Sequence, residues 1–345
     1  ADLQAQAQAA MDGLPGAIVV MEVETGRVLT MVSSPAADTN WYDPKNYNFS
    51  SLGSMLSIPN IELNRATQGQ YPLGSVFKIV TMAAALESGL FTPDTVYDCP
   101  YFYTEISGVT LQDWTWQRCE DEKLETGKDT CTRPSSKPSG ELTLVEGLMR
   151  SCDPWFYHIG YSLYNAGLTT AISDMSWGFG LGEVTGIEQV GEEPGVVPLP
   201  TDGLNATSLA IGQGNMLVTP LQVANFIAAI GNGGTLYRPQ LVENFLPAAG
   251  DTIQVFKPEA LSTLPIKAET LAAIQEGMRL VTENTRGTAY SRLGNFAIPT
   301  AGKTGTAESG TVDPQAWFAG YSLKGDPERP DIGVVVIVEK QGEGS

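Results

Sequence analysis

Segments with the pattern of β-strands occur at both ends of this chain, and segments with the pattern of helices fill its middle. Near the N-terminus, GAIVVMEVETGRVLTMVSS over 16–34 has two β-branched stretches around a Gly-containing turn at 24–27, which is typical of a hairpin. Near the C-terminus, strands are predicted over 297–304, 315–322 and 331–339. The simplest closure pairs all of these in one mainly antiparallel, five-stranded sheet, which predicts an α+β fold.

Between the strands, helices are expected over 75–88, 143–151, 153–167, 168–180, 219–234 and 267–283. Two stretches lack a helical pattern. Residues 35–70 are rich in Pro, Asn, Asp and Ser and predict a long irregular connection. Residues 95–140 predict an irregular, partly stranded excursion with a charged, solvated loop at 119–133.

We expect one domain over 1–345, packed as two lobes. The α/β lobe would combine about 1–50 with 233–345, where the sheet is packed with helices. The mostly helical lobe would cover about 71–232 and include the excursion at 95–140.

The charge balance is strongly acidic, with 39 Asp and Glu residues, 20 Lys and Arg residues and a net charge of -19. Such a surface argues against binding to a phosphate backbone, so we expect no nucleic-acid partner. No window approaches 18 consecutive apolar residues, and the first residues lack the pattern of a signal peptide. A membrane anchor would therefore lie outside this chain.

The chain has four cysteines and one histidine, which limits the metal sites that it could form. No C-x-x-C pair exists, and His158 lies among aromatic residues, which favours packing, so we predict neither a metal site nor a cofactor. Cys99, Cys119 and Cys131 lie in a polar, turn-rich stretch where an extracytoplasmic protein could form a disulfide, and the pairing stays open. Cys152 lies beside an apolar helix and predicts a buried thiol.

The stretch YPLGSVFKIVTMAAALE over 71–87 places Ser75 and Lys78 three residues apart where an apolar helix begins. In one interpretation, Ser75 caps the helix and Lys78 points to solvent. In the other, Lys78 removes the proton of Ser75, since residues three apart share a helix face, and burial and the helix dipole favour a neutral amine there. The first-turn amides could then bind an oxyanion. This motif alone leaves both interpretations open.

A second stretch, AGKTGTAES over 301–309, combines the ammonium group of Lys303 with the hydroxyl groups of Thr304 and Thr306. Two hydroxyl groups beside an ammonium group suit a carboxylate ligand. Gly305 would let another backbone approach closely, as a substrate strand requires. The alternative is a strand end followed by a turn.

A third stretch, RSCDPWF, carries Ser151 and Asp153 where two predicted helices meet. Taken alone, it is typical of a helix cap at the start of 153–167. Together the three stretches have the order S-x-x-K, then a serine motif, then K-T-G.

These motifs and the blocks NRATQGQYPLGSVFK, SCDPWFYHIG, IGQGNMLVTPLQVA and AGKTGTAE resemble the transpeptidase domain of class B penicillin-binding proteins, in the penicillin-binding protein and serine β-lactamase superfamily. The resemblance covers nearly the whole chain. The family's usual second motif ends in Asn, whereas this chain has Asp153, which is found in some members of the elongation type, penicillin-binding protein 2. An anionic Asp153 would change the charge beside Lys78.

The resemblance implies a catalytic role for each motif residue. Ser75 would be the nucleophile that forms an acyl-enzyme, and Lys78 would be its base. Ser151 would relay a proton to the departing amine. Asp153 would hydrogen-bond the substrate amide or Lys78, and Lys303 would stabilise the charges near Ser151.

The resemblance also implies the substrate contacts. Thr304, Gly305 and Thr306 would bind the substrate, with the two threonines holding its carboxylate. The backbone amides of Ser75 and Thr306 would form the oxyanion hole.

The implied activity is that of a peptidoglycan D,D-transpeptidase, which cross-links D-Ala-D-Ala stem peptides and is a target of β-lactams. Three alternatives are a serine β-lactamase or β-lactam sensor, a D,D-carboxypeptidase, and a catalytically silent β-lactam-binding domain. A lactamase needs a way to activate water, and no Glu-x-x-x-Asn block follows Ser151. Intact Ser75, Lys78 and Lys303 argue against a silent domain.

The resemblance finally implies partners and a location. Stem peptides and β-lactams would bind the site, and a membrane glycosyltransferase would bind regions outside this chain. Family members usually carry an N-terminal anchor helix, a non-catalytic domain before the catalytic one and a C-terminal helix over the sheet. We therefore expect this chain on the extracytoplasmic face of a bacterial membrane.

Overall fold

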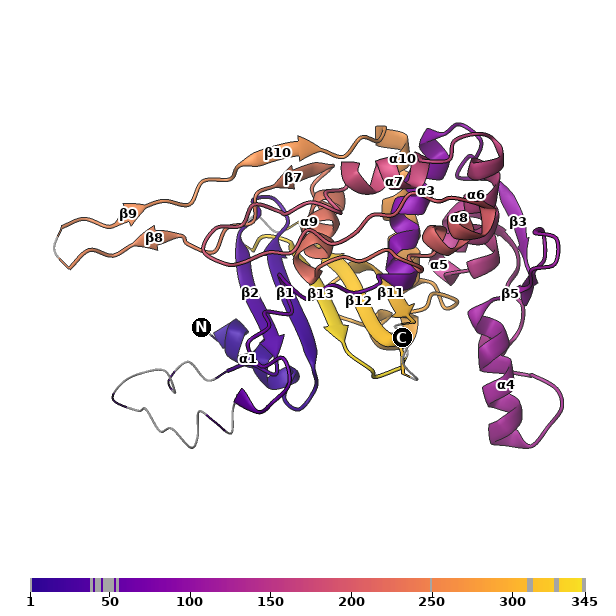
Figure 1. Cartoon of the computed structure of the whole chain (residues 1–345), viewed down its shortest axis with the longest axis horizontal. Coiled ribbons are helices and arrows are strands. Elements are labelled where there is room, and N and C mark those ends of the chain that lie inside the picture. The colour runs from indigo at the N-terminus through magenta and orange to yellow at the C-terminus, as the bar shows by residue number, and fades with distance from the viewer. Residues whose placement is uncertain are drawn as a thin grey trace.

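A computed structural model of the chain describes residues 2–37, 40, 45, 53, 56–248, 250–308, 313–325 and 329–342. A five-stranded antiparallel sheet has the strand order β11-β12-β13-β1-β2 (Figure 1). Its strands are β1 (Gly16–Glu22), β2 (Val28–Ser34), β11 (Thr300–Ala307), β12 (Gln315–Ser322) and β13 (Ile332–Val338). The predicted pairing of the N-terminal hairpin with three C-terminal strands is therefore confirmed, and β11 lies at one edge.

Strand β1 lies inside the sheet, where Val19 is opposite Val335 of β13 and Met31 of β2. All seven residues of β1 are buried. Helix α9 (Pro220–Gly231) packs on one face of the sheet, and α1 (Asp2–Ala10) packs beside β2 over a smaller apolar cluster on the other face. Because both faces are covered, β1 is a continuous apolar run rather than an alternating one.

The helices of the middle region surround α3 (Lys78–Glu87), of which every residue except Glu87 is buried. Helix α3 contacts α5, α6, α7 and α10. The further helices are α5 (Leu144–Arg150), α6 (Asp153–Asn165), α7 (Ala171–Gly178), α8 (Gly203–Ala210), α10 (Ala268–Glu283) and α11 (Tyr290–Leu293). The predicted helices over 143–151, 153–167, 168–180, 219–234 and 267–283 therefore all form, with shorter ends.

The predicted helix over 75–88 begins as a 3-10 turn, η2 (Gly74–Phe77), and becomes an α-helix at Lys78. Neither segment has a side-chain cap at its N-terminus, and the side chain of Lys78 is fully buried. The interpretation in which Ser75 caps the helix and Lys78 faces solvent is therefore wrong.

The prediction of a charged loop at 119–133 is also wrong over the first half of this range, where the chain forms helix α4 (Trp114–Thr126). Asp113 caps this helix by accepting a hydrogen bond from the Thr115 amide, and Gly127 ends it in the left-handed conformation, with φ 66°. Glu, Lys and Arg are good helix formers, and the Lys123 ammonium group lies 2.7 Å from Glu120 one turn away.

Two disulfides stabilise the segment 95–140. Cys119 is bonded to Cys131 across the end of α4, and Cys99 is bonded to Cys152. The prediction that Cys152 is a free buried thiol is therefore wrong. Cys99 ends β3 (Val96–Cys99), whose partner β6 (Gly140–Thr143) leads directly into α5, so residues 53 apart in sequence meet.

The described residues also form short paired strands and the 3-10 turn η3 (Pro134–Ser136). The strand pairs are β4 (Phe102–Tyr103) with β5 (Leu111–Gln112), β7 (Thr235–Tyr237) with β10 (Ala260–Thr263), and β8 (Asn244–Phe245) with β9 (Ile253–Gln254). Strand β7 packs against α9, whereas β8 and β9 lie on a long arm that extends away from the sheet (Figure 1). Much of the irregular connection predicted over 35–70 lies outside the described residues, and 57–70 consists mainly of turns. Among the described helices, none combines the length and apolarity that a membrane crossing needs.

Candidate active site

Three segments that are remote in sequence meet at a cleft of about 910 Å³. They are the η2–α3 segment, the junction of α5 with α6, and the edge strand β11. The motif residues that line the cleft are Ser75, Ser151, Asp153, Thr304, Gly305 and Thr306. The structure therefore brings all three predicted motifs to one site.

Two glycines allow η2 to lie directly on β11. Gly74 has a φ of +56°, and a Cβ atom there would lie 2.4 Å from the Thr306 carbonyl oxygen. A Cβ atom on Gly305 would lie 2.9 Å from the Val76 side chain and 3.1 Å from the Leu73 carbonyl oxygen. Gly305 was predicted to admit a substrate backbone, but its Cβ direction meets this chain's own backbone, so it places Ser75 beside β11.

Ser75 is half-buried at the cleft, one turn before the fully buried Lys78. The Lys78 Nζ atom donates to Asp153 Oδ1 at 2.6 Å and to the Ser151 carbonyl oxygen at 2.7 Å, and it lies 3.3 Å from Ser151 Oγ. An ammonium group has three donors, and these partners account for all of them. The amine of Lys78 is therefore directed to the α5–α6 junction, whereas the sequence predicted that it contacts the hydroxyl group of Ser75.

Ser151 ends α5 in the left-handed conformation, with φ 57° and ψ 34°. Its hydroxyl group accepts a hydrogen bond of 2.7 Å from Lys303 Nζ and also lies near Lys78. Ser151 thus joins the helical side of the site to the strand side, as the predicted proximity of Ser151 and Lys303 requires.

Lys303 lies on β11 and is fully buried. Besides Ser151, its Nζ atom donates to the Thr304 carbonyl oxygen at 2.9 Å. Burial lowers the pKa of Lys303 well below its usual value, and the nearby positive charge of Lys78 lowers it further, while Asp153 acts in the opposite direction. Burial without a carboxylate partner of its own therefore favours the neutral form of Lys303.

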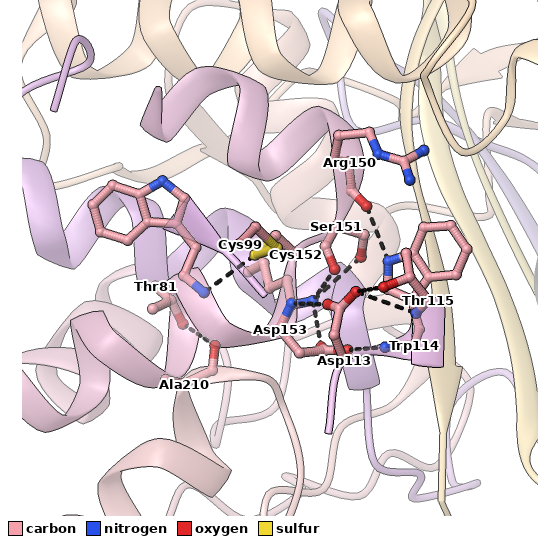
Figure 2. Close-up of polar contacts among 12 residues, drawn as sticks. Thr81, Cys99, Asp113, Trp114, Thr115, Arg150, Ser151, Cys152, Asp153 and Ala210 are labelled. Atoms are coloured by element: carbon pink, nitrogen blue, oxygen red, sulfur yellow. Dashed lines mark hydrogen bonds and ion pairs between the residues drawn. A yellow bond between two sulfur atoms is a disulfide. The ribbon is translucent and has the colours of Figure 1, made fainter. Parts of the chain in front are cut away.

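Asp153 begins α6, and a second acid that the sequence did not single out lies behind it (Figure 2). Asp113 is buried and accepts a hydrogen bond of 2.9 Å from the Asp153 amide, while Asp153 Oδ2 accepts one from the Trp114 amide. Burial and the charge of Asp153 raise the pKa of Asp113 to about 6. The local signal in LQDWTW indicates only a helix cap, so this link to the site could not be predicted.

The two threonines of β11 have different surroundings. Thr304 is buried, and its hydroxyl group lies 2.7 Å from that of Thr288, which follows α10. Thr306 is exposed at the cleft. Its backbone adjoins Gly74, so the amides of Ser75 and Thr306, predicted as an oxyanion hole, belong to two segments in direct contact.

A metal ion would need several deprotonated donor groups close together. Among the described residues, one group of three such side chains is close enough, formed by Cys99, Asp113 and Cys152. Its two sulfur atoms are joined in a disulfide, which leaves a single carboxylate as donor.

The comparisons with known proteins agree with this geometry. The family model described as the penicillin binding protein transpeptidase domain matches residues 16–345. The chain is 27% identical, over 97% of its length, to the peptidoglycan D,D-transpeptidase MrdA of Haemophilus influenzae. It is 29% identical, over 95% of its length, to the peptidoglycan D,D-transpeptidase PbpA of Mycolicibacterium smegmatis. The alignments cover only 51% and 62% of these two relatives.

Solved structures give the same result. A structure of a peptidoglycan synthase complex that coordinates polymerization and crosslinking matches 99% of this chain and 56% of its own, with 31% identity and a TM-score of 0.77. Penicillin-binding protein PBP2 of Pseudomonas aeruginosa in complex with WCK 5153 matches 99% of this chain and 73% of its own, with 25% identity and a TM-score of 0.80.

A third structure is the ceftriaxone acyl-enzyme of penicillin-binding protein A from M. tuberculosis. It matches 98% of this chain and 72% of its own, with 26% identity and a TM-score of 0.77. Since the family model covers almost the whole sequence and the fold is shared throughout, the chain belongs to the penicillin-binding protein transpeptidase domain family.

Proposed function

We propose that this chain is the catalytic domain of a peptidoglycan D,D-transpeptidase, which forms an acyl-enzyme through Ser75 and transfers the acyl group to an amine. One observation carries the proposal: Lys78 and Lys303 converge on the hydroxyl group of Ser151, beside Ser75, in a cleft closed by an edge strand. The names of the aligned relatives support the same reaction. We take 1–345 as one domain.

In the proposed reaction, the hydroxyl oxygen of Ser75 attacks the carbonyl carbon of the penultimate D-Ala. Lys78 first passes a proton to the hydrogen-bonded carboxylate of Asp153, and the neutral amine then accepts the proton of Ser75. The amides of Ser75 and Thr306 stabilise the oxyanion. Ser151 passes a proton to the departing D-Ala amine.

Lys303 and the threonines complete the proposed site. A neutral Lys303 accepts a hydrogen bond from Ser151 or donates one to it, so it can support proton relay in either direction. The hydroxyl groups of Thr304 and Thr306 bind the substrate carboxylate.

We also infer an extracytoplasmic location and an assembly partner. Two disulfides are typical of a protein that folds in an oxidising compartment. The similar structure of a synthase complex supports a membrane glycosyltransferase as the partner, bound through regions outside this chain.

Covalent labelling with a fluorescent penicillin tests the proposal. We expect an adduct on Ser75 that lasts for many minutes, is located by mass spectrometry and is absent from Ser75→Ala. Ser135→Ala is the matched control, because Ser135 is an exposed serine that lines the same cleft. No adduct on the wild-type chain would overturn the acyl-enzyme.

The lifetime and the products separate the related activities. Rapid loss of the adduct with hydrolysed penicillin would indicate a β-lactamase. With a peptide that ends in D-Ala-D-Ala, release of D-Ala without transfer to an added amine would indicate a carboxypeptidase. Transfer to the amine is the result expected for a transpeptidase.

A further inference from the structure

One wall of the cleft contains a buried guanidinium group without a carboxylate partner among the described residues. Arg150 is only 6% exposed and lines the cleft directly before Ser151. Its Nε atom donates to Ser139 Oγ at 3.1 Å and its Nη1 atom to the Arg286 carbonyl oxygen at 2.8 Å. Both partners are neutral oxygens, so the positive charge of Arg150 is not balanced by an ion pair.

The surroundings of Arg150 hold its guanidinium group in place. Trp114 lies 5.0 Å from it in a cation–π contact and donates its indole N–H to the Arg150 carbonyl oxygen (Figure 2). Arg286 donates to the Ser139 carbonyl oxygen at 2.8 Å. Arg150, Arg286 and Ser139 therefore form one hydrogen-bonded unit. Burial lowers the pKa of Arg150, and the charge of Arg286 lowers it further, while Asp113 acts in the opposite direction.

Other arginines of this chain show the usual arrangement. Arg27, Arg65, Arg133, Arg238 and Arg279 each form an ion pair with a glutamate. In contrast, Arg150, Arg286 and Arg292 line one cleft and form no ion pair with a described residue. The chain has 39 acids and 20 bases, so carboxylates are abundant, yet no described carboxylate is paired with these three.

The proposed chemistry indicates which part of the substrate these arginines face. Arg150 adjoins Ser151, the proposed proton donor to the departing amine. Arg286 lies two residues before Thr288, whose hydroxyl group contacts Thr304. The unit therefore adjoins both Ser151 and the Thr288–Thr304 contact in the same cleft, and in the second step the acceptor amine must arrive beside Ser151.

We propose that Arg150 and Arg286 form a carboxylate site for the acceptor, so that the acceptor is an amine with a carboxylate beside it, as in an amino acid. A guanidinium fork matches the two oxygens of a carboxylate. The proposal rests on the proposed transpeptidase function and adds the class of acceptor.

In the second step, Ser75, Lys78 and Ser151 account for every bond and proton that changes. The acceptor nitrogen attacks the ester carbonyl carbon, a C–N bond forms, and the C–O bond to Ser75 breaks. A proton leaves the acceptor nitrogen through Ser151, and Ser75 oxygen regains a proton from Lys78. The arginines bind the acceptor's carboxylate throughout and exchange no proton.

The direct test compares two acceptors that differ only in this group, D-alanine and D-alaninamide. The acyl-enzyme is formed from one labelled D-Ala-D-Ala peptide, and transfer to the amine is measured against hydrolysis, per unprotonated amine. In the wild-type chain we expect D-alanine to be favoured about tenfold or more, as for hydrogen bonds to a charged group. In Arg286→Gln the preference should fall to nearly one, and in Arg286→Lys to an intermediate value.

Arg238→Gln is the matched control, because this half-buried arginine pairs with Glu259 and does not line the cleft; it should keep the wild-type preference. An equal preference in the wild-type chain and Arg286→Gln would overturn the proposal. The proposal would also be overturned if Arg286→Gln left the acceptor preference unchanged and instead slowed acylation by donor peptides. This slowing would affect peptides with a free terminal carboxylate and not their amides. The arginines would then serve the donor.

A binding measurement keeps this proposal separate from the proposed function. The Nε–H signals of arginine side chains can be followed by NMR while D-alanine or D-alaninamide is added to unacylated protein. Shifts of the Arg150 and Arg286 signals with D-alanine alone support the carboxylate site even if no penicillin adduct forms. Equal responses to both compounds, or none, would overturn it.

Discussion

The two sides of the site each present a buried lysine to the same hydroxyl group, and their surroundings differ. On the helical side, Lys78 lies 2.6 Å from the carboxylate of Asp153, with Asp113 behind it. On the strand side, Lys303 donates only to neutral oxygens, those of Ser151 and Thr304. One amine is held in an ion pair, whereas the other is buried without a carboxylate of its own.

This difference teaches that proximity to Ser151 does not by itself assign the same role to both amines. A buried ammonium group without a counter-ion is costly, and the lowered pKa of Lys303 is the physical response. The ion pair of Lys78 instead fixes the position of the α5–α6 junction. The following changes test this division, from the largest expected effect to the smallest.

Lys78→Met should destabilise the helical side of the site. It leaves Asp153 and the Ser151 carbonyl oxygen without their buried donor, and the loss of one partner of such a pair costs about 3–5 kcal/mol of unfolding free energy. We also expect no penicillin adduct. Urea unfolding and labelling measure the two effects, and a loss of stability no larger than that of Lys303→Met would contradict the difference between the two lysines.

Asp113→Asn should remove a pH dependence of the unfolding free energy that arises on the helical side of the site. Because the pKa of Asp113 is raised from 3.8 to about 6, the folded chain binds this proton more tightly than the unfolded chain. Through this group, the unfolding free energy falls as pH rises from about 4 to about 6, by about 3 kcal/mol in total. The variant should lack this fall.

Urea unfolding of both proteins between pH 4 and pH 7 checks the prediction. Lost hydrogen bonds in the variant would give a constant offset, whereas the removed titration makes the variant gain on the wild-type chain as pH rises. A difference that does not change with pH would show that Asp113 is not the titrating group.

Gly305→Ala should disturb the contact between the two sides. Its Cβ atom would press on Val76 and Leu73, which costs about 1–2 kcal/mol of unfolding free energy and displaces Ser75 from β11. We expect penicillin acylation to slow several-fold. Gly333→Ala on β13 is the control, because the nearest atoms to its Cβ would lie 3.7 Å away; equal effects of both changes would count against the role of Gly305.

Lys303→Met should have the smallest effect on stability, below about 1 kcal/mol at pH 7, because no carboxylate is left without its partner. The unfolded chain protonates Lys303 more readily than the folded chain does, so this group's contribution to the wild-type unfolding free energy rises as pH increases towards 10.5. Unfolding at pH 7 and pH 9 should show this rise in the wild-type chain and not in the variant. Acylation should slow, since Ser151 loses a hydrogen-bond partner.

Much of the fold could be predicted because strand and helix patterns are local. The five strands and the long helices follow from apolar periodicity, and pairing the ends of the chain is the simplest way to close a sheet. Helix α4 was missed because its acidic residues lack an apolar face, so its cap at Asp113 and its end at Gly127 were the only signals. The bond between Cys99 and Cys152 depends on strand pairing that sequence does not reveal.

The site was predicted as a meeting of motifs, and the convergence of Ser75, Lys78, Ser151 and Lys303 in space agrees with that prediction. The direction of the Lys78 amine was not predictable, since it depends on how α6 begins. Arg150, Arg286 and Asp113 were missed for a similar reason: each belongs to a segment whose local pattern indicates a helix end or a cap. Their importance comes only from what the fold places beside them.

The left-handed backbone of Ser151 has a consequence for which amino acids can occupy this position. Threonine carries the same hydroxyl group, but a β-branched side chain is strongly disfavoured at a positive φ. Glycine and asparagine tolerate the conformation and lack the hydroxyl group. Serine is thus the common residue that satisfies both the backbone geometry and the need for a hydroxyl group, so the shape of a helix end restricts the chemistry that this position can acquire.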